Sequence, residues 1–457
     1  MSMLNIGMSG LNASMAALSA TSNNVANAMV PGYSRQQVVL SSAGNGIYGS
    51  GTGVMVDDVR RISDQYEVAQ LWNTTSNLSF AKAQSSYLGQ VEQIFGSDGS
   101  SISKGLDLLF ASLNSAMEKP NETAYRQGVL NEAKALTQRF NSISEGLSSQ
   151  VAQVEGQIGA SAKEINVQLE TIASFNIEIQ KSNASGSAPL ALLDARDAAV
   201  DDLSKIVDVN VVEGADGMLN ISLAQGQPLL SGPTASKILV KPDPANPLFS
   251  QINIQFGQSN FPLNETAGGN LGALIDYRDN SLVDSMAFID ELATTMADEF
   301  NAVLASGTDL NGNPPTQDLF RYDPTNPAGS LTMTPGLTAD MLAFGKDGTP
   351  GDNSNLKDLV KLSDKNLTFS SMGVNTTMSD AFASKIGELG SISRQAKMNQ
   401  DTAEKLQLEA QGQWASTSGV NMDEEGVNLI IYQQSYQANA KIISTADKLF
   451  QTILNSI

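Results

Sequence analysis

The chain has 457 residues, of which 48 are acidic and 27 basic, so its net charge is −21 at pH 7. This acidic balance, without any block of basic residues, argues against nucleic acid and anionic membrane surfaces as partners. Cysteine and histidine are both absent, which excludes a disulfide framework, a Cys/His zinc site and a Ser-His-Asp triad, and we expect neither metal nor cofactor.

The N-terminal thirty residues carry an apolar side chain at every third or fourth position. This stripe has one polar member, Ser22, and consists otherwise of Leu4, Met8, Leu11, Met15, Leu18, Val25 and Met29. A repeat of 3.5 residues is the coiled-coil pattern and predicts a helix. The segment lacks the positive start and long apolar stretch of a cleaved export signal. No run of about 18 apolar residues, as a membrane span requires, occurs in the chain.

A Val30-Pro31-Gly32-Tyr33 turn follows, in which proline fixes one backbone dihedral and glycine frees the next. Two short strands are predicted at 37–41 and 53–60, on either side of a glycine-rich loop. The loop has the glycine spacing of a dinucleotide-binding motif, at Gly44, Gly46 and Gly49. Such a motif must open a helix, whereas a strand-like run follows here, so we interpret the loop as part of a hairpin.

The region from Ile62 to Ile206 is predicted to be mostly helical. Its longest helix is predicted between Asn121 and Lys181, where there is no proline and an apolar residue recurs at near-3.5 spacing. A pattern of this length without internal caps indicates a coiled-coil rod, about 90 Å long at 1.5 Å per residue.

Alternating apolar and polar residues over 207–268 predict a small antiparallel β domain inserted into this helical chain. Helical periodicity returns from 269 to about 306, and the last rod helix is predicted at 378–413. Between them, 307–377 is rich in Pro, Gly, Asn and Asp and is predicted to be a long irregular connection with short strands or turns. Within it, Asp309 to Asn313 weakly resembles a calcium loop, but Pro314 and Phe320 replace the glycine and acid such a loop needs, so we expect a turn.

A second apolar stripe occupies a C-terminal helix predicted over 427–457. Its one polar member is Asn439, and the others are Leu429, Tyr432, Tyr436, Ile443, Ala446, Phe450, Ile453 and Ile457. The acids at 423–425 precede this helix, where they favour the positive end of its dipole.

The two terminal stripes are expected to pair with each other. Burial along such narrow seams roughly balances the entropy lost on ordering two helices. We therefore expect both ends to be disordered in an isolated chain and helical in an assembly. The alternative is an ordinary intramolecular helix pair that closes one domain.

These elements form a nested arrangement. The fold class is mainly α, with coiled-coil terminal helices, a long α-helical rod and one inserted antiparallel β domain. We expect residues 1–35 and 418–457 to form the inner coiled-coil domain. The rod comprises 36–206 and 269–417, and the β domain comprises 207–268.

Two terminal motifs indicate a family. Ser-Asn-Asn-Val-Ala-Asn at 22–27 with Pro-Gly-Tyr-Ser-Arg-Gln at 31–36 resembles the N-terminal signature of bacterial flagellar rod, hook and hook-associated proteins. Ser-Gly-Val-Asn-Met-Asp-Glu-Glu at 418–425 and the Tyr-Gln-Gln-Ser-Tyr run from 432 are similar to their C-terminal signature. The length, Leu-Leu-Asp-x-Arg-Asp at 192–197 and Gly-x-Leu-Gly at 269–272 resemble the members at the hook–filament junction. The chain departs in having Val30 before Pro-Gly-Tyr, and it has room for only one outer β domain.

The resemblance implies a structural protein, not an enzyme, that self-assembles as an adaptor between hook and filament. It implies export through the flagellar type III apparatus without a cleaved signal peptide, and an extracellular location in the flagellum. The implied partners are further copies of the chain, the hook protein, the second hook–filament junction protein and an export chaperone on the C-terminal helix. The assembly residues would be those of both stripes, and the family motif that shapes the inner turn comprises Asn23, Asn24, Asn27, Pro31, Gly32, Tyr33 and Arg35.

Three alternatives remain. The chain could be another axial protein, either the second junction protein or the hook protein, although its rod-length helices disfavour the hook protein. It could be a type III-exported coiled-coil effector or translocator. An enzyme such as a cell-wall glycosidase would need two acids about 5–9 Å apart in a cleft, and no convincing pair is present.

Overall fold

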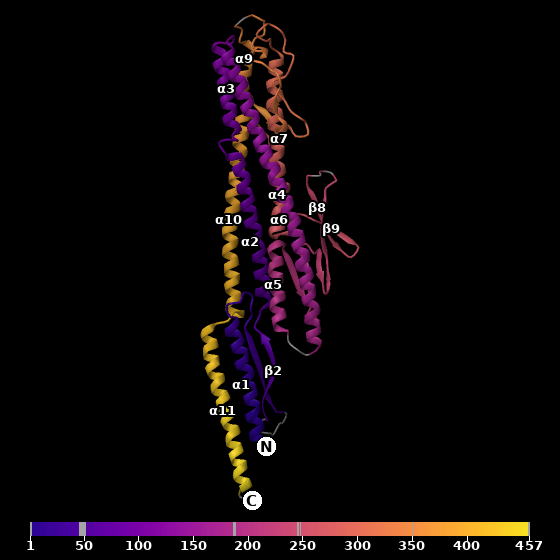
Figure 1. The fold of residues 1–457 in the computed structure, drawn as a ribbon, viewed down its shortest axis with the longest axis vertical. Helices are drawn as coiled ribbons and strands as arrows, with labels where there is room; N and C mark the ends of the chain where they lie inside the picture. Colours follow the sequence, from indigo (N-terminus) through magenta and orange to yellow (C-terminus); the bar gives the residue numbers. More distant parts are fainter. Residues whose placement is uncertain are drawn as a thin grey trace.

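The protein is an elongated, mainly helical molecule with both termini at one end (Figure 1). The computed structural model describes residues 2–44, 52–185, 189–244, 246, 248–349 and 351–455. The glycines at 46 and 49 and the stripe residue Ile457 lie outside these ranges. The predicted fold class, mainly α with an inserted antiparallel β region, is confirmed. The division of the chain into domains stays a prediction.

Five helices of the rod lie outside 269–305: α2 (Gln65–Gly96), α3 (Ile102–Glu118), α4 (Thr123–Ala184), α5 (Leu190–Ile206) and α10 (Met378–Ser418). Hydroxyl and carboxylate caps start three of them, because Asp64, Ser101 and Thr377 each accept from a backbone N–H of the first turn. The predicted 3.5-residue pattern of α4 is its buried face, which includes Leu136, Phe140, Ile143, Leu147, Val154 and Ile158, all fully buried.

The helix predicted over 269–306 is divided in the structure. It consists of α6 (Gly269–Asp276), a π-helical turn η2 (Tyr277–Leu282) and α7 (Val283–Ala305). The π turn directs Tyr277 inward, where its ring stacks on Tyr87 with 5.2 Å between centroids. Its neighbour Arg278 pairs with Glu155 of α4 at 3.1 Å. These buried contacts, which periodicity does not reveal, accompany the interruption of the helix.

Two antiparallel sheets lie beside the rod between Val209 and Leu263 (Figure 1). One contains β3 (Val209–Glu213), β4 (Leu219–Leu223), β5 (Pro228–Ser231) and β6 (Thr234–Ala235) in sequential order. The other contains β7 (Lys237–Pro242), β8 (Ser250–Phe256) and β9 (Ser259–Leu263). Side-chain amides of α4 hold both sheets, since Asn176 donates to the carbonyl of Leu219 and Asn166 donates to that of Ile238. A 3-10 turn, η1 (Glu265–Ala267), leads back into α6.

The segment 307–377 caps the end of the rod opposite the termini (Figure 1). The short strands and turns predicted for it are present, together with short helices, and they surround three fully buried rings, Phe320, Phe344 and Phe369. Its elements are β10 (Phe320–Arg321), α8 (Pro327–Ser330), β11 (Thr332–Met333), η3 (Ala339–Met341), α9 (Ser354–Val360), η4 (Lys361–Asp364), β12 (Leu367–Phe369) and β13 (Val374–Thr376). The predicted turn at Asp309 is present, because its carboxylate accepts from two backbone N–H groups of its own loop.

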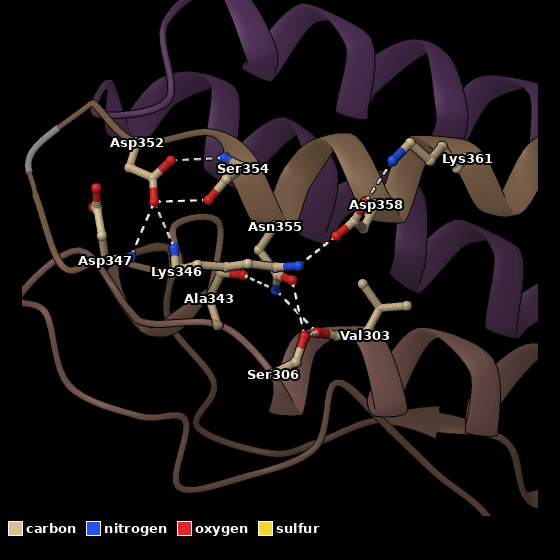
Figure 2. Close-up of polar contacts among 10 residues, drawn as sticks. All are labelled: Val303, Ser306, Ala343, Lys346, Asp347, Asp352, Ser354, Asn355, Asp358 and Lys361. Atoms are coloured by element: carbon tan, nitrogen blue, oxygen red, sulfur yellow. Dashed lines mark hydrogen bonds and ion pairs between the residues drawn. The ribbon is translucent and has the colours of Figure 1, made fainter.

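Polar side chains fasten this cap to the rod (Figure 2). Asn355 donates to the backbone carbonyls of Val303 and Ala343, at 3.0 and 2.7 Å. Backbone N–H donation, first from Lys346, lowers the pKa of Asp352 well below its usual range. The cap therefore uses carboxylates to order loops that have few apolar side chains.

Candidate assembly interface

The terminal unit consists of α1 (Ser2–Asn27), the hairpin of β1 (Gln36–Ala43) and β2 (Gly53–Arg61), and α11 (Met422–Asn455). Figure 1 shows α1 lying between α11 and the hairpin, and it packs against both. The two strands lie within one or two residues of the predicted bounds and pair antiparallel, with a bulge between Val39 and Leu40. Helix α11 starts five residues earlier than predicted, because the Asn421 side chain accepts from the N–H groups of Asp423 and Glu424 and caps it.

Small residues form the contact between α1 and its neighbours. A side chain added at Gly7 would meet Ile443 at 2.8 Å, and one at Gly10 would meet the Asn439 amide at 2.5 Å. Glycine at both positions therefore allows a close approach of the two helix backbones. On the hairpin side, Ser9 Oγ accepts from the N–H of Val54 at 3.2 Å. The buried apolar residues of α1 are likewise small: Ala13, Ala17 and Ala20.

The large residues of the predicted stripes are not fully covered by this contact. Met8 and Met15 of α1 are 53% and 52% exposed, and Phe450 and Ile453 of α11 are 61% and 57% exposed. Leu4, Ser22 and Met29 are also exposed and Ala446 is buried, whereas the remaining described stripe members are half-buried: Leu11, Leu18, Val25, Leu429, Tyr432, Tyr436, Asn439 and Ile443. The expected mutual burial of the stripes is therefore incomplete, because α1 turns its small residues toward its neighbours.

Both ends of the single chain are helical and paired with each other. This contradicts the prediction that the ends are disordered in an isolated chain. The alternative, an intramolecular helix pair, describes it. The apolar stripes alone do not predict this pairing, because two further contacts stabilise it. One is the contact of α1 with the hairpin, and the other is a polar joint between the chain ends.

That polar joint centres on Asn24, which is buried and uses its whole amide. Its Nδ2 donates to the Gln36 carbonyl at 2.9 Å and to Glu425 at 3.2 Å. Its Oδ1 accepts from the Tyr33 hydroxyl at 3.0 Å and from the Gln36 N–H at 2.8 Å. Two donated and two accepted bonds satisfy the amide completely. One side chain therefore connects α1, the turn, β1 and α11.

Arg35 supplies the charge in the joint. Its Nε lies 2.7 Å from the buried carboxylate of Glu425, and its Nη1 lies 3.0 Å from the exposed Glu424. Its backbone N–H donates to the carbonyl of Ser418 at the end of α10.

Burial, and then the nearby carboxylates of Asp194 and Glu425, raise the pKa of Tyr33 to about 12.

The other motif residues have local roles. Gly32 has φ of +78°, which only glycine adopts without strain. Asn27 donates to the carbonyl of Asn23 one helical turn earlier, and Pro31 is exposed at the turn.

The ion pair of Glu425 with Arg35 was not predicted, since the sequence suggested only an interaction of Glu425 with the helix dipole. A signal was present, however: Arg35 is the first charged side chain in the chain, and an acidic triplet opens the other terminal segment.

A second set of ion pairs joins the terminal unit to the rod. Arg61 at the end of β2 pairs with Asp194 at 3.1 Å and with Asp197 at 2.7 Å, both in the Leu-Leu-Asp-x-Arg-Asp element of α5. Burial lowers the pKa of Arg61, but Asp197 and Asp194 outweigh it and leave that pKa above its ordinary value. The intervening Arg196 points the other way and donates to the carbonyl of Gly217 in the β region. This element therefore contacts both the terminal unit and the β region.

In the described part of the chain, none of the helices combines the length and apolar content that a membrane-crossing segment needs.

Family models match three segments of this chain. The flagellar hook-associated protein FlgK helical domain matches residues 88–320. The flagella basal body rod protein family matches 4–33, and the C-terminal family of flagellar basal body rod FlgEFG proteins matches 411–456. These last two matches coincide with the two terminal segments described above.

Full-length relatives and a solved structure are also similar to this chain. Flagellar hook-associated protein 1 of Salmonella typhimurium is 28% identical over 555 aligned positions, covering 99% of both chains. That of Bacillus subtilis is 26% identical over 491 positions, covering 98% of this chain and 96% of the relative. The flagellar hook junction protein FlgK from Burkholderia pseudomallei superposes with a TM-score of 0.67 at 17% identity, over 77% of this chain and 100% of that chain. Because the Salmonella alignment is longer than this chain, that relative contains residues that this chain lacks.

Proposed function

This chain belongs to the FlgK family of flagellar hook-associated proteins, and we propose that it is the adaptor subunit that joins hook to filament in its own bacterium. The family is structural, and the subunit acts by contact with its neighbours in the flagellum and carries out no catalysis. Relatives that match over nearly their whole length are hook-associated proteins 1, which supports this junction role over that of the second junction protein or the hook protein.

One observation carries the assembly mechanism: large apolar side chains of both terminal helices stay exposed after the helices have paired. On α11 they form two groups, one near its start (Val427, Ile430, Ile431) and one near its end (Leu449, Phe450, Ile453, Leu454). Burying each such side chain contributes roughly 1.5–3 kcal/mol. Neighbouring copies packed side by side would cover them, and Met8 and Met15 of α1 with them. The hook protein and the second junction protein would meet the two ends of such an assembly.

The exposed apolar residues of α11 also affect how the protein is exported. We place the protein outside the cell in the flagellum, reached through the type III apparatus without a cleaved signal peptide. In the cytoplasm the exposed end of α11 would be covered by an export chaperone, because a cluster of exposed large apolar residues promotes aggregation.

Deletion of 424–457 tests the proposal in cells that lack their own copy of the gene. We expect cells that secrete filament protein but do not retain filaments on their hooks, and that do not swim. The purified deletion variant should keep the melting transition of the rod, since the rod core lies in α2 to α7 and α10. Swimming by cells with the truncated chain would contradict the proposal.

A finer variant replaces Leu449, Phe450, Ile453 and Leu454 with serine and leaves the helix length unchanged. Its matched control replaces two exposed apolar residues of the rod, Leu108 and Val167, with serine. The first variant should lose junction assembly, and the control should swim normally.

A further inference from the structure

A cleft lies where the terminal unit meets the rod. It has a volume of about 350 Å³ and is bordered by Pro31 and Gly32 of the turn, by α2, by α5 and by α10. Both tryptophans of the chain, Trp72 and Trp414, line it, together with Leu71. Large aromatic side chains are enriched at the centres of protein interfaces. An open cleft with two tryptophans is therefore suited to receive an apolar side chain.

The turn that borders the cleft also presents an apolar projection. Met29 is 94% exposed and the adjacent Val30 is 52% exposed, and neither lines the cleft of its own chain. Met29 precedes Pro31 by two residues, so along the long axis it lies within about 8 Å of the border of the cleft. Projection and cleft are thus at nearly the same height on the molecule.

Equal height matters for copies that stand side by side. When parallel copies surround a common axis, a projection on one copy meets a neighbour's surface at its own height. A contact between two different surfaces is heterologous, and it continues from copy to copy into a ring or a helix. We propose that the Met29–Val30 turn of one copy docks into the Trp72–Trp414 cleft of the next. This inference rests on the proposed assembly function and identifies a contact within it.

Charge is compatible with this occupant. The acids that line the cleft already have partners, because Lys205 pairs with Asp201 at 3.1 Å and with Asp202 at 2.6 Å, and Asp197 pairs with Arg61. The turn from 28 to 34 has no charged side chain. Docking therefore brings apolar surfaces together without burying an unpaired charge.

The absence of cysteine makes a direct test possible. One plasmid encodes Met29→Cys and another encodes Gln411→Cys, at an exposed cleft position, in cells whose own copy is deleted. Flagella are isolated, oxidised and analysed without reductant. We expect a covalent dimer that contains both variants, and no such dimer when either variant is expressed alone. Val30→Cys with Gln407→Cys provides a second pair in case the first pair does not fold or assemble.

The control pair is Met398→Cys with Gln411→Cys. Met398 is about as exposed as Val30 of the projection, but it lies about 20 Å from Gln411 along α10 at 1.5 Å per residue. A dimer with the control pair as well, no dimer with either test pair, or a cross-link to a different protein overturns the inference. If the variants still support swimming in those cases, the proposed function stands. If the unaltered chain fails to restore filament attachment, the proposed function and this inference are both wrong.

Discussion

The rod and the terminal unit have the same helical repeat but cover their apolar residues differently. In α4 the large residues at 3.5-residue spacing face the other helices, and side chains such as Phe140 and Leu147 are fully buried. In α1 the same spacing places Met8 and Met15 outward, while Gly7 and Gly10 face α11. The apolar stripe of α4 is thus covered within one chain, whereas the stripes of the terminal unit have apolar surface left for neighbours. Stability and assembly should therefore depend on different residues.

The largest effect on stability is expected in the rod. Phe140→Ala removes a fully buried ring and should lower the free energy of unfolding by about 3–5 kcal/mol. Val167→Ala, at an exposed position of the same helix, should change it by less than about 0.5 kcal/mol. Chemical denaturation followed by circular dichroism measures both. Equal effects of the two substitutions would contradict the assignment of α4 as the core of the rod.

An intermediate effect is expected at the polar joint. Glu425→Ala leaves Arg35 without its buried partner and leaves one Asn24 hydrogen bond unmade, which should cost about 1–3 kcal/mol. The loss should be confined to the terminal unit, with faster amide hydrogen exchange in α11 and unchanged exchange in α4. Glu424→Ala is the matched control, because its carboxylate is exposed and its pair with Arg35 is worth less than about 1 kcal/mol. Unchanged exchange in α11 of the Glu425 variant would show that the joint does not hold the chain ends together.

Alkaline pH should weaken the same joint by a smaller amount. The pKa of Tyr33 is raised to about 12, whereas an unfolded tyrosine titrates near pH 10. Between these values the unfolded chain binds fewer protons than the folded chain, so the stabilisation from Tyr33 is complete below pH 10 and is lost as the pH rises toward 12. Tyr33→Phe should flatten this decline in melting temperature, and Tyr66→Phe, at an exposed tyrosine, should not. An identical decline in both variants would exclude Tyr33 as its source.

Much of the fold could be predicted because long apolar repeats and glycine-rich turns are local signals. The sequence predicts α4, the β1–β2 hairpin and the strands within 207–268. It does not predict the π turn at Tyr277, because stacking with Tyr87 depends on a residue far away in the chain. The sequence predicts short strands or turns in 307–377 but not the short helices among them, since carboxylate–backbone bonds replace apolar periodicity there.

For the candidate site, the sequence predicts which residues form the apolar stripes but not which way they face. A 3.5-residue repeat identifies a stripe but does not say whether the stripe or the adjoining small residues make the intramolecular contact. Gly7 and Gly10 decide this in the terminal unit, where they lie against Ile443 and Asn439, because close backbone approach is possible only where side chains are absent. The pairing of Arg35 with Glu425, 390 residues apart, likewise required the folded chain.

The smallest effect on stability should accompany a loss of function. Met8→Ser with Met15→Ser alters side chains that are already about half exposed in the single chain, so the free energy of unfolding should change by less than about 1 kcal/mol. Filament attachment should nevertheless fall sharply, because these residues lose their burial against neighbouring copies. Met398→Ser, at an equally exposed site on α10, should leave both stability and swimming unchanged. Swimming by the double variant at the normal rate would mean that the outward face of α1 stays in water in the assembled junction, and that other surfaces hold the copies together.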